Sequence, residues 1–103
     1  DAALRIGAQV IELHTGAYCE LHAENLTQER DEELQRLMTM AQYANALGLE
    51  VHAGHGLTYD TVKPVASIAN IHELNIGHFL IGESIFSGLE VTIKKMRRLI
   101  NEA

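Results

Sequence analysis

Three short segments with the alternating pattern of β-strands are separated along this chain by segments with helical spacing. The strand patterns are QVIELH at residues 9–14, EVHAG at 50–54 and HELNI at 72–76. Strands that alternate with helices lie parallel to one another in one sheet, with the helices as crossovers. The order of these segments therefore predicts an α/β fold.

The best-marked helix pattern covers residues 28–47, where apolar residues recur along one face. Thr27 is the expected N-cap, and Gly48 is the expected stop. The preceding stretch TGAYCELHAEN, at residues 15–25, is expected to form a loop.

The later helices are less regular. A cap at Thr58 is expected to start a helix over residues 60–68, although Pro64 weakens it. Residues 78–103 are expected to be mostly helical with a break near Gly88. The FLIG stretch within them also fits a strand.

The first strand pattern divides its side chains between two faces, with Ile11 and Leu13 on one and Glu12 and His14 on the other. Three strands with helices on one side leave an open edge and an uncovered face that carries Glu12. Closure with further strands into a barrel solves both problems. The chain also opens on DAALRIGA, without a methionine, and AALRIGA looks like the end of a helix that runs into a strand. We therefore expect it to be part of a longer barrel protein.

Charge and composition exclude several classes of partner. The net charge of −6 argues against nucleic acid, because phosphate backbones require clustered Lys and Arg. No apolar run approaches the roughly 20 residues that span a bilayer, and no leader pattern is present. Cys19 is the single cysteine, so no internal disulfide is possible. These features predict a cytoplasmic protein without membrane partners.

Each expected strand end combines polar side chains with a glycine: ELHTG at 12–16, AGHGL at 53–57 and NIGH at 75–78. In a parallel barrel, functional residues gather at these ends and in the loops that follow. Glycine lets an anion approach backbone N–H groups, and a following helix N-terminus favours negative charge. The second and third ends therefore suit a phosphate.

The same residues also admit plain structural readings. Glu12 fits a carboxylate bonded to polar groups of a neighbouring strand, and His55 and His78 fit turn histidines bonded to backbone. His52 has the opposite strand parity from His55, so a regular strand would not point both inward. The chain has six histidines, but it contains no Cys-x-x-Cys or His-Glu-x-x-His pattern, so no metal site is expected.

Taken together and in this order, IELHTGAY, AGHGLTY and HELNIGHFLIG resemble the C-terminal part of the pyridoxine 5'-phosphate synthase family. The resemblance covers nearly the whole chain. It implies a (β/α)8 TIM barrel in which these segments are about the sixth to eighth strands with their helices. Residues 1–103 would then be the C-terminal portion of a single barrel domain.

The resemblance also implies a reaction. The family condenses 3-amino-2-oxopropyl phosphate with 1-deoxy-D-xylulose 5-phosphate to pyridoxine 5'-phosphate, phosphate and water, without metal or organic cofactor. His55 corresponds to the histidine that acts as proton donor, and Glu12 to a glutamate with a transition-state role. Gly56, Gly77 and His78 correspond to positions that bind the phosphate of the amino ketone.

The chain departs from the family pattern in two ways. His52 stands where many relatives are expected to have asparagine, and the family's other catalytic histidine and glutamate belong to earlier strands. The isolated chain is therefore expected to be inactive, and the family suggests a homo-oligomer. Two alternatives stay open: another phosphate-binding barrel enzyme, or a phosphate-binding module without catalysis.

Overall fold

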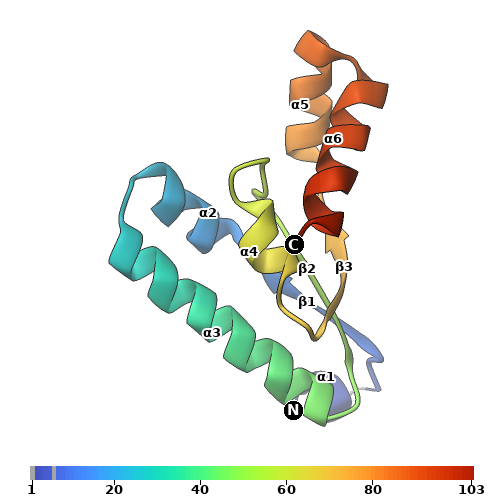
Figure 1. The fold of residues 1–103 in the computed structure, drawn as a ribbon. Helices are drawn as coiled ribbons and strands as arrows, with labels where there is room; N and C mark the ends of the chain where they lie inside the picture. The colour runs from blue at the N-terminus through green and yellow to red at the C-terminus, as the bar shows by residue number, and fades with distance from the viewer. Residues whose placement is uncertain (1, 6) are drawn as a thin grey trace.

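A computed structural model describes residues 2–5 and 7–103 (Figure 1). Three parallel strands form one sheet in the order β1-β2-β3. The strands are β1 (Val10–His14), β2 (Glu50–Gly54) and β3 (Ile71–Asn75). The helices of the described ranges are α1 (Ala2–Arg5), α2 (Gly16–Ala23), α3 (Thr27–Ala46), α4 (Val62–Ala66), α5 (His78–Ser87) and α6 (Leu89–Asn101). The predicted α/β fold with a parallel sheet is confirmed, while Ile6 of the AALRIGA stretch lies outside the described residues.

The two faces of the sheet differ in chemistry, as the alternation in β1 predicts. Leu13, Ala53 and Leu74 are register neighbours across the three strands and face the helices. Glu12, His52 and Glu73 form the next row and face the opposite way. The sheet therefore has one apolar face under helices and one polar face.

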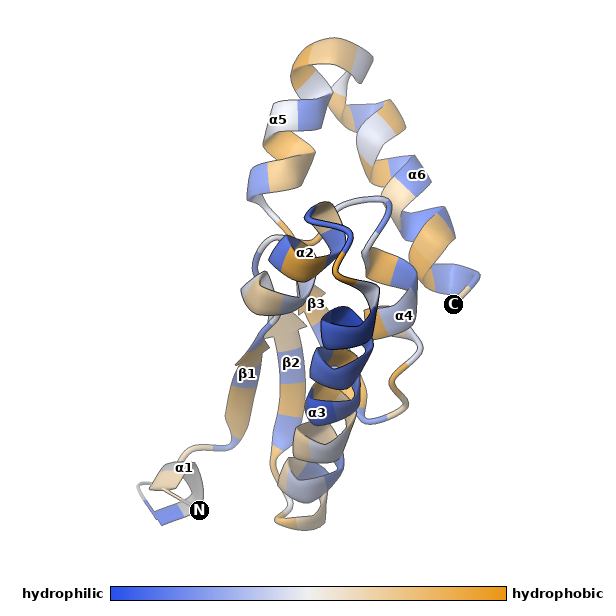
Figure 2. Ribbon diagram, turned by 90° about the vertical axis from the view of Figure 1, so that its left-hand side faces the viewer, coloured by the Kyte–Doolittle hydropathy of each residue, from blue (hydrophilic) through white to orange (hydrophobic). Residues whose placement is uncertain are grey.

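The core lies between the apolar face of the sheet and helices α3 and α4. Figure 2 shows α3 alongside the sheet, and Leu37 and Ala41 of this helix are almost fully buried. They pack with Val51 and Ala53 of β2 and with Val65 of α4 in one cluster. Burial of this apolar surface holds the helices on the sheet.

The prediction of a loop over residues 15–25 is wrong, because Gly16–Ala23 forms α2. The helix is stabilised by tertiary packing, since Tyr18 is 2% exposed and belongs to the core cluster. Asn25 then reverses the chain at a φ of 58°. Gly16 at the start of this segment favoured the prediction of a loop. The helix forms because the buried side chain of Tyr18 packs into the core.

The helix over 28–47 is confirmed within a residue at each end, but Thr27 is its first residue and Leu26 its N-cap. The helix expected over 60–68 is shorter and begins at Val62. The Thr58 N–H donates to Thr61 Oγ1 over 2.8 Å and closes a turn before the helix. Pro64 lies in the first helical turn, where no N–H donor is needed.

The last segment is helical on both sides of a break at Gly88, as predicted, and Gly88 has a φ of 83°. FLIG lies within α5, so the strand alternative is wrong. In Figures 1 and 2, α5 and α6 form a hairpin that extends away from the sheet. Its exposed apolar side chains are Ile81, Ile85, Phe86, Leu89, Val91 and Ile93. No helix in the described ranges is long and apolar enough to cross a membrane.

The third strand begins one residue earlier than predicted and contains an irregularity. Val51 pairs with Ile71, whereas His52 pairs with Glu73, so His72 has no register partner on β2. A bulge of this kind shifts the side-chain alternation by one residue. It brings Asn75, rather than Leu74, to the polar face at the end of the strand.

Replacing Leu37 with alanine tests the core. Leu37 is 1% exposed, so Leu37→Ala in the complete protein should lower the free energy of unfolding by about 2–5 kcal/mol. Urea denaturation measures this change. Gln42→Ala, at an exposed position of the same helix, should change it by less than about 0.5 kcal/mol. Equal effects of the two substitutions would contradict this description of the core.

Candidate active site

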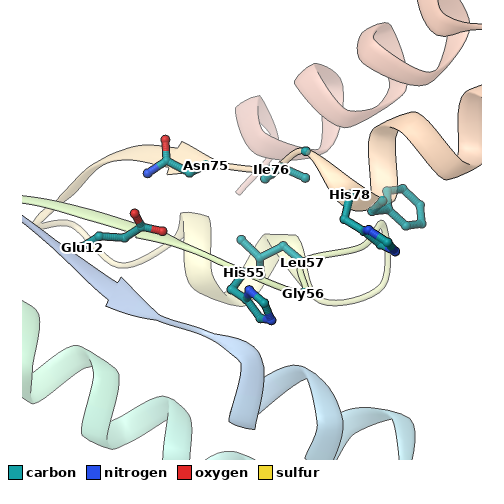
Figure 3. A pocket seen from close by; sticks show the side chains of 9 residues that line it. Glu12, His55, Gly56, Leu57, Asn75, Ile76 and His78 are labelled. Carbon is teal, nitrogen blue, oxygen red and sulfur yellow. The ribbon is translucent and has the colours of Figure 1, made fainter.

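One cavity of about 460 Å³ opens at the carboxyl end of the sheet (Figure 3). Its lining residues come from β1, from the end of β3 and from the segments that follow β2 and β3: Glu12, His55, Gly56, Leu57, Asn75, Ile76, Gly77, His78 and Phe79. All five predicted site residues are in this set: Glu12, His55, Gly56, Gly77 and His78. The structure thus brings together residues that are far apart in the sequence.

The position of the Glu12 carboxylate depends on the glycine at 54. A Cβ atom at Gly54 would lie 2.7 Å from Glu12 Oε1 and 2.6 Å from the Asn75 carbonyl oxygen. These separations are too short for any side chain. Gly54 therefore leaves the space in which the Glu12 carboxylate lies over β2, on the face of the sheet that also carries Asn75 (Figure 3).

His55 has a backbone conformation that residues other than glycine rarely adopt. Its φ is 87°, and such a conformation costs on the order of 1–3 kcal/mol unless the surroundings enforce it. Thr15 provides that enforcement, because its Oγ1 donates to the His55 carbonyl over 2.7 Å and its N–H donates to the Gly54 carbonyl over 2.8 Å. Thr15 is 1% exposed, so both bonds are shielded from water.

The His55 ring stacks on His14, with ring centroids 4.2 Å apart and planes inclined by 26°. Gly16 makes the stack possible, since a Cβ there would lie 2.6 Å from His14 Cε1 and 2.9 Å from His55 Cδ2. The Gly16 N–H also donates to His14 Nδ1 over 3.3 Å. His14 is not among the predicted site residues, although its shared face with Glu12 at a strand end was a usable signal.

Gly56 follows His55 at a φ of 79°, and a Cβ there would lie 3.3 Å from Cys19 Cβ. The Cys19 thiol lies 3.7 Å from Thr61 Oγ1, and burial raises the pKa of this thiol. A raised pKa keeps the sulfur protonated near neutral pH, which disfavours nucleophilic attack. Cys19 therefore acts here as a packing partner for the turn.

Gly77 is the N-cap of the ten-residue helix α5, and His78 is its first residue. The first backbone N–H groups of a helix have no partner within it, and they favour an anion. A Cβ at Gly77 would meet nothing within 4 Å. The helix end therefore borders open space that a phosphate group could occupy.

His52 lies on the polar face of the sheet and does not line the cavity. Its Nε2 lies 2.6 Å from Glu50 Oε2 and 3.6 Å from Glu73 Oε2. The side chain is 16% exposed, so these carboxylates are its main polar partners. His52 links β2 to β3 below the cavity. Opposite strand parity does not separate it from His55, because β2 ends at Gly54 and His55, at a φ of 87°, lines the cavity with Glu12 on the same side of the sheet.

Four further lining residues are absent from the predicted set: Leu57, Asn75, Ile76 and Phe79. Asn75 shares the polar face with Glu73, as alternation along HELNI places it, and it begins the NIGH strand end, so a sequence signal for it was present. Within the described ranges, no three His, Cys, Asp or Glu side chains gather closely enough to hold a metal ion.

The family profile described as "Pyridoxal phosphate biosynthesis protein PdxJ" matches residues 1–102 of the chain. The chain belongs to this family. The resemblance inferred from the three motifs is thereby confirmed. PdxJ membership covers both the strand-end segments and the helices between them.

Curated relatives carry the name pyridoxine 5'-phosphate synthase. The protein of Roseobacter denitrificans is 67% identical over 103 residues, that of Ruegeria pomeroyi 66%, and that of a Jannaschia species 59%. Each match covers 100% of this chain but only 41% or 42% of the relative. The chain thus spans about two fifths of the length of these PdxJ relatives.

A methyl group at position 54 tests how closely the Glu12 site is packed. In the complete protein, Gly54→Ala should lower the free energy of unfolding by about 1–3 kcal/mol, because the new Cβ collides with backbone and carboxylate atoms. The matched control is Gly82→Ala, within α5 and with nothing within 4 Å, which should be neutral or stabilising by up to about 1 kcal/mol. Denaturant unfolding compares the two. A Gly54→Ala protein as stable as the control would refute the close approach.

Proposed function

We propose that the complete protein containing this chain is a pyridoxine 5'-phosphate synthase. It condenses 3-amino-2-oxopropyl phosphate with 1-deoxy-D-xylulose 5-phosphate and releases phosphate and water. The observation that carries the proposal is that Glu12, His55, Gly56, Gly77 and His78 line one cavity in a member of the PdxJ family. The names of the curated relatives support the same activity.

The fold of the complete protein is proposed to be a (β/α)8 barrel, with β1, β2 and β3 as its sixth to eighth strands. Support comes from the polar face that carries Glu12, His52 and Glu73, which would become the barrel interior. Further support comes from an apolar groove of about 420 Å³ beside β1 and α3, lined by residues that include Ile11, Met40 and Leu49. A neighbouring strand and helix would cover this groove.

His55 is proposed to supply the proton in the dehydration steps. Loss of water from an intermediate requires a proton at the leaving oxygen, and imidazole is the side chain best suited to exchange protons near neutral pH. The contact with His14 and the bond from Thr15 hold the ring at the cavity before any substrate arrives. Such preorganisation lowers the barrier because the donor need not be repositioned.

Glu12 and the glycines have complementary roles in the proposal. The Glu12 carboxylate stabilises positive charge that develops on the amino-ketone part during ring closure. Gly56, Gly77 and His78 bind the phosphate of that substrate through backbone N–H groups and the N-terminus of α5. This division puts the reacting carbons between the carboxylate and the imidazole.

The remaining parts of the proposal come from the family resemblance. The reaction uses no metal or organic cofactor, and the second histidine, second glutamate and most contacts to the pentulose phosphate come from other segments of the complete protein. We also infer a cytoplasmic homo-oligomer with small phosphorylated substrates and no nucleic-acid or membrane partner. The net charge of −6 agrees with the absence of a nucleic-acid partner.

Substitution of the proposed proton donor separates catalysis from simple phosphate binding. His55→Asn in the complete protein should lower kcat by about 10²–10⁴, with little change in affinity for inorganic phosphate. Steady-state product formation and phosphate titration calorimetry measure the two quantities. His72→Asn, at an exposed position on β3, is the matched control and should keep wild-type turnover. Normal turnover of His55→Asn would favour a non-catalytic phosphate-binding module.

The isolated chain provides a second test. Residues 1–103 incubated with both substrates should form no detectable product, because one histidine, one glutamate and the pentulose-phosphate contacts are proposed to lie elsewhere. The complete protein assayed in parallel should form it steadily. Product formation by the isolated chain would overturn the proposed division of the active site.

A further inference from the structure

Tyr59 connects the turn after β2 with the helical hairpin after β3. Its ring meets Phe79 edge to face, with centroids 4.7 Å apart and an interplanar angle of 76°. Lys95 Nζ lies 4.2 Å from the centre of the same ring, and the Tyr59 hydroxyl donates to the Thr92 carbonyl over 3.4 Å. One side chain therefore contacts the first turn of α5 and the middle of α6.

The Tyr59–Phe79 contact joins two segments that both contribute residues to the cavity. Phe79 directly follows His78 and lines the cavity, while Tyr59 lies three residues after Gly56. The Tyr59–Phe79 contact thus spans the two segments that are proposed to hold the same phosphate. A change in this contact would alter the separation of Gly56 from Gly77.

Helix α5 follows β3 after Ile76, which packs against the core, and Gly77. None of its described residues is buried, and α5 packs mainly against α6 in the hairpin. The hairpin itself extends away from the sheet (Figure 1). Within the described part of the chain, Tyr59 therefore provides a specific link between the start of α5 and the sheet end that carries His55.

We propose that Tyr59 is a positioning residue that sets the geometry of the proposed phosphate site, to which Gly56 contributes from the segment after β2 and Gly77 and His78 from the start of α5. Lys95 of α6 assists, because its ammonium group contacts the Tyr59 ring. This inference rests on the proposed function. Interactions that hold the substrate equally in the ground state and the transition state change KM and leave kcat nearly unaltered, so a residue that positions the phosphate-binding groups can raise KM without touching the substrate.

The test uses the complete protein and three variants at the contact. Tyr59→Leu should raise KM for 3-amino-2-oxopropyl phosphate and Kd for inorganic phosphate by about tenfold or more, with kcat changed by less than about threefold. Tyr59→Phe keeps the ring contacts and should stay within about twofold of wild type in each constant. Lys95→Met removes the cation and should raise KM and phosphate Kd by about two- to fivefold.

Two matched controls remove similar groups from the same hairpin. Phe86→Leu removes an aromatic ring from α5 at a position 88% exposed, and Lys94→Met removes an exposed lysine that pairs with Glu90. Both should leave KM and phosphate Kd unchanged. Circular dichroism and thermal melting of every variant establish that the protein is folded. If Tyr59→Leu does not fold, Lys95→Met becomes the deciding variant. An unchanged KM and an unchanged phosphate Kd in folded Lys95→Met would overturn the inference.

The outcomes distinguish this inference from the proposed function. Wild-type turnover together with wild-type KM and phosphate Kd in folded Tyr59→Leu would overturn the role of Tyr59 and leave the synthase activity intact. A complete protein that binds phosphate but makes no pyridoxine 5'-phosphate would overturn the proposed function. In that case, weaker phosphate binding in Tyr59→Leu would still support the positioning role.

Discussion

The parallel register of the three strands is the constraint on which the site depends. Because β1, β2 and β3 run in one direction, Glu12, His55 and Gly77 reach the same edge of the sheet from distant parts of the sequence. Thr15 fixes this alignment at the carboxyl ends of β1 and β2. Its N–H donates to the Gly54 carbonyl, and its Oγ1 donates to the His55 carbonyl. A slip of one residue would reverse the faces and remove the carboxylate from the cavity.

Much of this arrangement was predictable from the sequence because it depends on short-range patterns. The alternation in β1 predicts that Leu13 and Glu12 lie on opposite faces of the sheet. In the structure Leu13 is buried and Glu12 is exposed, as predicted. The helix α2 and the stacked His14 were not predictable, since each depends on a partner elsewhere in the chain. Tyr18 stabilises α2 only by entering a core that other segments build, and His14 meets His55 only after the strands have paired. Propensity and periodicity do not report such contacts.

The surfaces of the chain divide into two chemical kinds. The polar face of the sheet holds His52 between Glu50 and Glu73. The outer surfaces, by contrast, include exposed apolar side chains on α5 and α6 and an apolar groove beside β1. Exposed apolar patches of this kind are uncommon on an independent small domain, and the chain spans only 41% or 42% of the PdxJ relatives.

The left-handed backbone of His55 has a consequence for protein engineering. Glycine would relax that turn, and programmes that raise heat resistance commonly replace residues whose backbone is unfavourable. Replacing His55 with glycine would remove the imidazole ring and, with it, the stacking contact between His55 and His14. Position 55 is therefore one at which a relaxed backbone and the imidazole side chain make opposite demands on the same residue.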